Sequence, residues 1–294
     1  MTTTTIAPAG QQFTTRKLHP TFGLEITGLD VSKPLDAATV AALTKLSGEH
    51  KLLVFKGQNL SSEQLNGFAQ YFGDTKQVPP QLSGRNNRER EHNVSRLGNQ
   101  EDADKPHVAP TGYGIVARFW HTDSSWWPIP TWLTFLTAVE LPDADGDTGF
   151  ADMQAAYDAL SDERKALLEG KSMIHSWRTL RHYEPTIPAM GDDENVPPPA
   201  THPLVRTVNG RKSLFLNGHV SYYVGNMPFE EGEALFRELM AHATSPAFTY
   251  QHKWAIGDLA MWDDRTTMHR AMPYDTRQRR VMHRAEVLGV EVPK

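Results

Sequence analysis

The stretch "HPLVRTVNGRKSLFLN" (202–217) places two β-rich runs on either side of the pair Asn209-Gly210. An Asn-Gly pair in this position is the strongest short-range signal for a hairpin, because both residues tolerate the positive φ angles of a type I′ turn. Further strand-like runs follow toward the C-terminus: "FTYQHKW" (248–254), "LAMW" (259–262) and "RRVMHRAEVLGV" (279–290). The C-terminal half is therefore expected to consist mainly of antiparallel strands.

Helices are expected around these strands. Asp36 can cap a helix that starts at residue 37, and Ser61 with Gln64 forms a capping box for a second helix. Other segments are assigned by their apolar pattern: strands in "KLLVF" (51–55) and "WLTFLTAVEL" (132–141), helices in "ADMQAAYDALSDERKALLEG" (151–170) and "EEGEALFRELMAHAT" (230–244). Residues 73–117 are polar and rich in Pro and Gly, which predicts a long loop.

This pattern has neither an alternating βα rhythm nor an internal repeat, so it predicts a mainly β fold with helical additions, either a sandwich or a barrel. Nothing in the composition marks a domain boundary. We therefore expect residues 1–18 to form a flexible N-terminal tail and residues 19–294 to form a single domain.

Composition excludes several classes of function. The 294 residues contain no cysteine, which rules out disulfides, thiolate nucleophiles and iron–sulfur clusters. A net charge of −5 argues against a general nucleic-acid binder, and no apolar run is long enough to span a bilayer. The N-terminus lacks the pattern of a secretion signal, so a cytoplasmic location is the default expectation. Any bound metal must be held by His and carboxylate side chains.

One candidate metal motif lies in "FWHTDSSWW" (119–127), where His121 and Asp123 are two residues apart. In a strand, such residues point to the same face and would offer two ligands to one ion. The spacing alone is weak, because 13 histidines and 35 acidic residues should give roughly one or two such matches by chance. A second match, His182-Tyr183-Glu184, precedes a proline-rich segment that does not predict a strand.

A ferrous site of the type with two histidines and one carboxylate needs another His on a facing strand. His269 is a candidate, and Arg280 and Arg284 follow it by eleven and fifteen residues. Strand alternation puts the two arginines on one face, roughly 13 Å apart. Arginine grips carboxylate or sulfonate groups in a fork, so two separate anion sites near one metal are expected.

In this order, the motifs resemble the TauD/TfdA family of Fe(II)/2-oxoglutarate-dependent dioxygenases. The resemblance spans roughly residues 19–290, and its collinear order makes it specific. The motifs that carry it are "FGLEITGLDV" (22–31), "LLVFKGQNLSSEQLNGFAQYFG" (52–73), "WHTDSSW" (120–126), "GDTGFADMQAAYDAL" (146–160), "HPLVRT" (202–207), "GRKSLFLN" (210–217) and "WDDRTTMHRA" (262–271). The resemblance implies a double-stranded β-helix, or jelly roll.

The resemblance also implies a metal centre and a reaction. His121, Asp123 and His269 would bind Fe(II), and they would be the catalytic residues. The enzyme would consume 2-oxoglutarate and O₂, release succinate and CO₂, and hydroxylate a small organic acid that is aryloxyalkanoate- or sulfonate-like. Small-molecule acids are thus the expected partners, and homo-oligomers are usual in the family.

Three further residues match the family's acid-binding positions. Arg280 matches the clamp for the distal carboxylate of 2-oxoglutarate, and Thr148 matches its hydroxyl partner. Arg284 matches the arginine that meets the acidic group of the primary substrate. Histidines 202, 219 and 283 are expected to be structural.

The sequence departs from the family pattern at two places. Asp264 stands where the family generally has Asn, and the segment "DTKQVPPQL" (74–82) lacks the His and Tyr that taurine-type members carry there. Taurine is therefore not favoured, and the role of loop 74–118 stays open. Two alternatives also remain: a superfamily member that desaturates or cyclises a metabolite, and a cupin-like metal-binding protein without catalysis.

Overall fold

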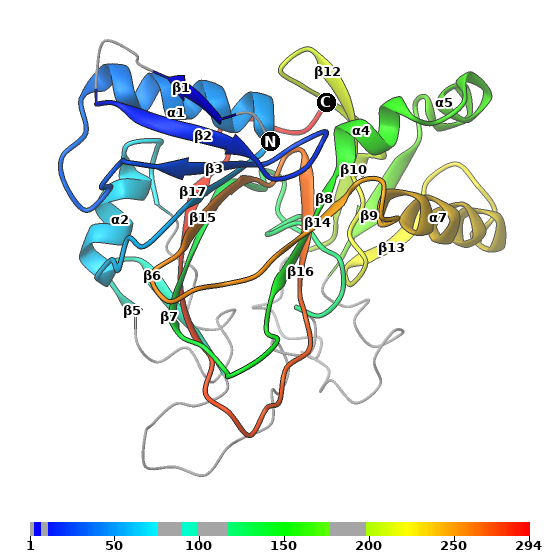
Figure 1. Ribbon diagram of the computed structural model, residues 1–294. Helices are drawn as coiled ribbons and strands as arrows, with labels where there is room; N and C mark the ends of the chain where they lie inside the picture. The colour runs from blue at the N-terminus through cyan, green and yellow to red at the C-terminus, as the bar shows by residue number, and fades with distance from the viewer. Residues whose placement is uncertain (1–2, 7–10, 76–89, 99–116, 177–197) are drawn as a thin grey trace.

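The structure, a computed structural model, describes residues 3–6, 11–75, 90–98, 117–176 and 198–294. Strands dominate these residues and form two facing layers, with helices packed outside them (Figure 1). No helix in the described part of the chain is long and apolar enough to cross a membrane.

The first layer is a nine-stranded sheet with the order β1-β2-β3-β4-β15-β7-β17-β6-β5. Neighbouring strands are antiparallel except for β3 and β4, which are parallel. The strands of this layer are β1 (Thr3–Ile6), β2 (Phe13–Lys17), β3 (Leu24–Thr27), β4 (Leu52–Phe55), β5 (Arg90–Glu91), β6 (Val94–Gly98), β7 (Thr131–Glu140), β15 (Leu259–Asp263) and β17 (Val281–Leu288).

The second layer consists of smaller antiparallel groups: β14-β8-β16, β10-β9-β13 and the hairpin β11-β12. Their bounds are β8 (Thr148–Asp152), β9 (Ser172–His175), β10 (Ala200–Pro203), β11 (Val205–Val208), β12 (Arg211–Leu214), β13 (Ser221–Val224), β14 (Thr249–His252) and β16 (Thr267–Ala271). Two facing layers of mainly antiparallel strands form a jelly roll, which confirms the predicted fold class.

Aromatic and aliphatic side chains fill the space between the layers. Phe150 of β8 packs edge-on against Trp262 of β15, with ring centroids 5.3 Å apart. Both side chains are almost completely buried, together with Leu136, Ala138 and Met282 from the first layer. Burial of this apolar surface holds the two layers in register beside the residues described below.

The helices cover the outer faces of both layers (Figure 1). On the large sheet, α1 (Ala37–His50) and α2 (Ser62–Gln70) pack in a core that also contains Phe55, Phe135 and Val287. On the second layer, α4 (Met153–Asp158), α5 (Asp162–Leu168) and α7 (Phe229–Ala243) contribute to a separate core. These helices do not contribute residues to the candidate metal centre.

The local predictions of caps and turns are confirmed. The Asp36 side chain accepts a hydrogen bond from the Thr39 N–H, and Ser61 and Gln64 form the reciprocal bonds of a capping box. Val208 pairs with Arg211 across Asn209 and Gly210, whose φ angles are 52° and 76°. Both central residues thus have the positive φ that the type I′ hairpin requires.

Other predictions of secondary structure were wrong in part. The segment 151–170 forms two helices, but its first two residues complete β8. The expected loop 73–117 contains β5 and β6, because β6 pairs with β17 on one side and with the edge strand β5 on the other. Within the expected tail 1–18, residues 13–17 form β2, with Phe13 buried in the core. The single domain for residues 19–294 stays a prediction.

A buried ion pair ties the two layers together. The ammonium of Lys51, the residue between α1 and β4, lies 2.9 Å from the Asp152 carboxylate at the end of β8, and the exposed fractions of the two side chains are 2% and 0%. Asp152 also accepts hydrogen bonds from the first backbone N–H groups of α4, at Gln154 and Ala155. The Asp152 carboxylate therefore forms the ion pair between the layers and also caps the N-terminus of α4.

We predict that Lys51→Met lowers the free energy of unfolding by about 3–5 kcal/mol, because it leaves a buried carboxylate without its counter-charge. Lys45→Met is the matched control, since Lys45 is exposed on α1 and its nitrogen lies 3.9 Å from Glu49. An exposed pair of this kind contributes less than about 1 kcal/mol. Urea denaturation of both variants measures the difference, and equal losses would show that the buried pair does not hold the layers.

Candidate metal centre

A short antiparallel bridge brings two histidines together. The His121 N–H donates to the His269 carbonyl at 2.9 Å, and the His269 N–H donates to the His121 carbonyl at 2.8 Å. His269 lies within β16, where it is also opposite Phe150 of β8. The two imidazole rings have centroids 4.1 Å apart. Residues separated by 148 positions (269 − 121) in the chain thus share one location.

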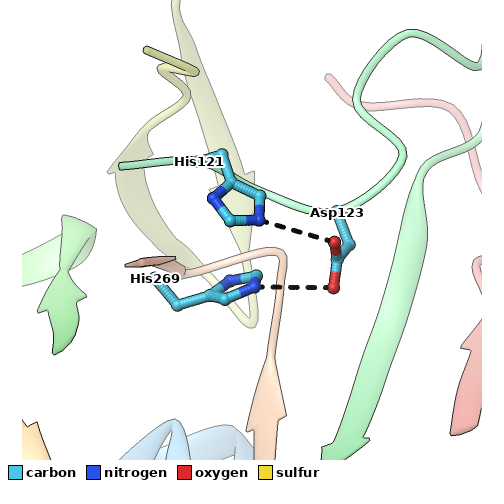
Figure 2. A group of neighbouring side chains, drawn as sticks. All are labelled: His121, Asp123 and His269. Atoms are coloured by element: carbon cyan, nitrogen blue, oxygen red, sulfur yellow. Dashed lines mark ion pairs between the residues drawn. The ribbon is translucent and has the colours of Figure 1, made fainter. Parts of the chain in front are cut away.

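The Asp123 carboxylate faces both rings (Figure 2). One of its oxygens lies 3.8 Å from Nε2 of His121, and the other lies 3.7 Å from Nε2 of His269. One potential ligand atom from each residue lies within 4.8 Å of the others, and all three residues are buried. Because metal–ligand bonds of about 2.0–2.2 Å allow two ligands of one ion to lie up to about 4.4 Å apart, the separations from Asp123 suit one shared cation.

The protonation state of the rings also suits a metal. Burial lowers the pKa of His121, and it lowers the pKa of His269 well below the ordinary value. Both rings are therefore neutral at pH 7, which is the form that binds metals. Nδ1 of His121 donates to the Phe119 carbonyl at 2.8 Å, so the lone pair of this ring is on Nε2, the atom that faces Asp123.

The prediction that His121 and Asp123 lie in one strand was wrong. His121 forms an isolated bridge, whereas Asp123 is the first residue of a turn in which Ser124 has a φ of 58°. The Asp123 N–H donates to a side chain, Oδ1 of Asp264, at 3.1 Å and not to a neighbouring strand. The two side chains still converge, because this bond anchors the turn beside β15.

Asp264 and Thr134 support the Asp123 carboxylate. The Thr134 hydroxyl lies 3.0 Å from Oδ2 of Asp123 and 2.6 Å from Oδ2 of Asp264. Burial, together with the nearby charge of Asp123, raises the pKa of Asp264 well above its ordinary value. Nδ1 of His269 lies 3.9 Å from Oδ1 of Asp264. Asp264, which stands where the family generally has Asn, thus contacts or neighbours two of the three candidate ligands.

Arg280 lies just before β17 in a largely buried position. Its Nε donates to the Gly146 carbonyl at 3.0 Å, and its guanidinium lies 5.7 Å from the centre of the Tyr274 ring. Burial lowers the pKa of Arg280, but an arginine retains its charge at pH 7. Thr148, two residues after Gly146, is buried at the start of β8, where its hydroxyl accepts a hydrogen bond from Trp254 at 3.0 Å.

Arg284 points toward the three-residue centre. One of its terminal nitrogens lies 3.4 Å from Oδ1 of Asp123, and the other lies 3.2 Å from Oε2 of Glu286. The Arg284 side chain is 22% exposed, whereas the Glu286 side chain is 5% exposed. The two arginines therefore contact different protein groups, and the two separate anion sites stay a prediction.

Three residues near the centre were not assigned to it from the sequence: Thr134, Glu286 and His219. The His219 ring lies 4.8 Å from the His121 ring, although this histidine was expected to be merely structural. Its pKa is well below the ordinary value because of burial. Strand pairing brings Thr134 of β7 and Glu286 of β17 to the site, whereas His219 reaches it from the turn between β12 and β13, and no local motif marks any of the three. The second motif, His182-Tyr183-Glu184, lies outside the described residues.

Comparisons with known proteins agree with this geometry. The family described as "Taurine catabolism dioxygenase TauD, TfdA family" matches residues 14–285. The chain is 36% identical to the alpha-ketoglutarate-dependent 2,4-dichlorophenoxyacetate dioxygenase of Cupriavidus pinatubonensis, over 92% of this chain and 96% of that one. It is 34% identical to the (S)-phenoxypropionate/alpha-ketoglutarate-dioxygenase of Sphingobium herbicidovorans, over 92% of this chain and 93% of that one.

A solved structure is similar over almost the whole chain. It is the crystal structure of AAD-2 in complex with Mn(II) and N-oxalylglycine, with a TM-score of 0.85 and 35% sequence identity. The similarity covers 96% of this chain and 98% of AAD-2. On the match across residues 14–285 and these near-complete similarities, the chain belongs to the TauD/TfdA family of dioxygenases.

Proposed function

We propose that this protein is an Fe(II)- and 2-oxoglutarate-dependent dioxygenase that hydroxylates a small organic acid. The observation that carries the proposal is the convergence of His121, Asp123 and His269 on one buried point. Two neutral imidazoles and one carboxylate are the ligand set of non-haem Fe(II) oxygenases, which leaves positions open for a cosubstrate and O₂. The products are succinate, CO₂ and the hydroxylated acid.

The substrate is an aryloxyalkanoate-like or sulfonate-like acid. The relatives from Cupriavidus and Sphingobium are named for 2,4-dichlorophenoxyacetate and (S)-phenoxypropionate, both of which carry an aryl ether next to a carboxylate. This chain offers Arg284 beside the metal centre for such an acidic group. The substrates for which the relatives are named, and the partial exposure of the Arg284 side chain, both favour a small anionic molecule as the substrate.

The chain's own residues bind and orient the reactants. His121, Asp123 and His269 hold Fe(II), which when bound supplies the oxidising chemistry that no amino-acid side chain provides. Arg280 and Thr148 hold the distal carboxylate of 2-oxoglutarate, and burial of the arginine strengthens that contact because water is excluded. Arg284 orients the primary substrate. The rate gain from the protein thus comes from positioning.

The proposal is tested with a panel of aryloxyalkanoates, sulfonates and amino acids, incubated with the protein, Fe(II), 2-oxoglutarate and O₂. Succinate release that depends on one of these acids supports the proposal, and ¹⁸O₂ must label the organic product. Succinate without labelled product would point to desaturation. No succinate with any acid would contradict the proposal. The cytoplasmic location and a homo-oligomeric state stay predictions.

We predict that His121→Ala weakens Fe(II) binding by more than about 100-fold and abolishes turnover, because loss of even an outer-shell partner costs 10–100-fold. His182→Ala, in the second His-x-carboxylate motif, is the control and should change neither property. Anaerobic calorimetry with Fe(II) measures binding without relying on activity. Equal losses in both variants would mean that the assignment of the ligands is wrong.

We predict that Arg280→Ala raises the KM for 2-oxoglutarate by about a hundredfold, since removing a charged clamp from a desolvated site costs a few kcal/mol. Arg284→Ala should instead raise mainly the KM for the primary substrate. Arg279→Ala is the control, because Arg279 pairs with Glu140 at 2.8 Å, away from the centre, and should change neither KM. An exchange of the first two effects would reverse the assigned roles.

A further inference from the structure

Glu286 is a buried carboxylate beside the substrate arginine. It follows Arg284 by two residues on β17, so both side chains project from the same face of the sheet. Its Oε1 accepts hydrogen bonds from the Thr131 hydroxyl at 3.1 Å and from the Ser124 hydroxyl at 3.4 Å. Contacts with β7 and with the turn after Asp123 therefore fix the carboxylate in place.

This position makes Glu286 part of the electrostatic environment of the centre. Its Oε2 forms an ion pair with Arg284 at 3.2 Å, while the other terminal nitrogen of Arg284 faces Asp123. Its charge also reaches His269, where it raises the pKa against the larger lowering effect of burial. A cation bound at the centre would neutralise the negative charge of Asp123. The Glu286 carboxylate, in contrast, neutralises part of the positive charge of Arg284 directly.

The consequence concerns the charge of the acid group that can bind. A carboxylate or sulfonate brings one negative charge, which the guanidinium meets. A phosphonate loses its second proton near neutral pH and so brings close to two negative charges at about pH 8, where the second charge would lie near the buried Glu286 carboxylate. A binding site discriminates against a ligand most effectively when a charged group of that ligand lies near a protein charge of the same sign that cannot move away. The bonds from Thr131 and Ser124 prevent such movement.

We propose that Glu286 is a positioning residue that restricts the primary substrate to singly charged acid groups, by holding Arg284 and by repelling a second negative charge. This inference rests on the proposed function, because it assigns the substrate's acidic group to Arg284. It adds a substrate class: carboxylates, sulfonates and sulfate esters are accepted, and phosphonates and phosphate esters are rejected.

The test compares two probes that differ in their acid group, phenoxyacetate and phenoxymethylphosphonate. Calorimetry at pH 8 measures the Kd of each for the protein loaded with Mn(II) and N-oxalylglycine, so that no turnover occurs. The wild-type protein should bind phenoxyacetate at least about tenfold more tightly than the phosphonate, and Glu286→Gln should bring the two values within about threefold. Gln retains an oxygen that can accept from Thr131, so the side chain keeps its place.

Glu140→Gln is the matched control. Glu140 pairs with Arg279 at 2.8 Å at the end of β7, and its side chain is 41% exposed. This variant also removes one negative charge from an arginine pair, formed by the last residue of β7 and a residue just before β17, but away from the centre. It should leave both dissociation constants unchanged. If Glu140→Gln reduced the ratio of the two Kd values as much as Glu286→Gln does, the effect would arise from the net charge of the protein and the proposal would be wrong.

The wild-type protein provides a test that does not depend on the folding of a variant. A phosphonate, like a phosphate ester, loses its second proton near neutral pH. The ratio of the two Kd values should therefore widen by at least about threefold from pH 6 to pH 8, with phenoxyacetate as the reference for any change in the protein. Equal binding of both probes at pH 8, or binding of neither, would overturn the inference.

Failure of this inference can be distinguished from failure of the proposed function. If the acid panel yields succinate but Glu286→Gln leaves the Kd ratio unchanged, the role assigned to Glu286 is wrong while the enzyme class stands. If no acid stimulates succinate release, the proposed function falls, and the substrate class inferred from Glu286 falls with it.

Discussion

Two backbone hydrogen bonds between His121 and His269 are the constraint on which the rest of the centre depends. They are reciprocal, so they fix the distance and the relative orientation of two chain segments that are far apart in the sequence. The two imidazoles lie side by side because their backbones pair, and pairing of β16 with β8 fixes His269 within the second layer. The packing of Phe150 against Trp262 then sets that layer against the sheet that carries Arg284.

Features that are determined within a few residues of chain could be predicted from the sequence. The caps at Asp36 and Ser61 and the turn at Asn209-Gly210 each depend on one backbone geometry and one or two side chains. The strand β16 could not be predicted in this way, because "TMHRA" has no apolar alternation and forms a strand through its pairing with β8. The strand β6, next to the sheet edge, was missed for the same reason.

The candidate site shows the same difference between features that local sequence determines and features that strand pairing determines. The candidate ligands and the two arginines could be named from the sequence through their motifs and the family resemblance, even though Asp123 reaches its position through a turn and not through strand alternation. The residues that support these side chains could not be predicted from the sequence. Glu286 is opposite Thr134 because β17 pairs with β7, and Asp264 meets the Thr134 hydroxyl because β15 pairs with β7 on the other side. Sheet order brings these groups together, and no spacing within a segment encodes it.

Lys51 shows how one position can satisfy two unrelated demands. Its backbone has a φ of 66°, in the left-handed region where glycine or asparagine is least strained, yet its side chain neutralises Asp152 inside the protein. Glycine or asparagine would relax the backbone but remove the ammonium, whereas an apolar side chain such as Met would remove the ammonium and keep the strain as well. Residues 51 and 152 are consequently expected to change together in divergent members or in redesigned variants, with an uncharged pair as the simplest joint replacement.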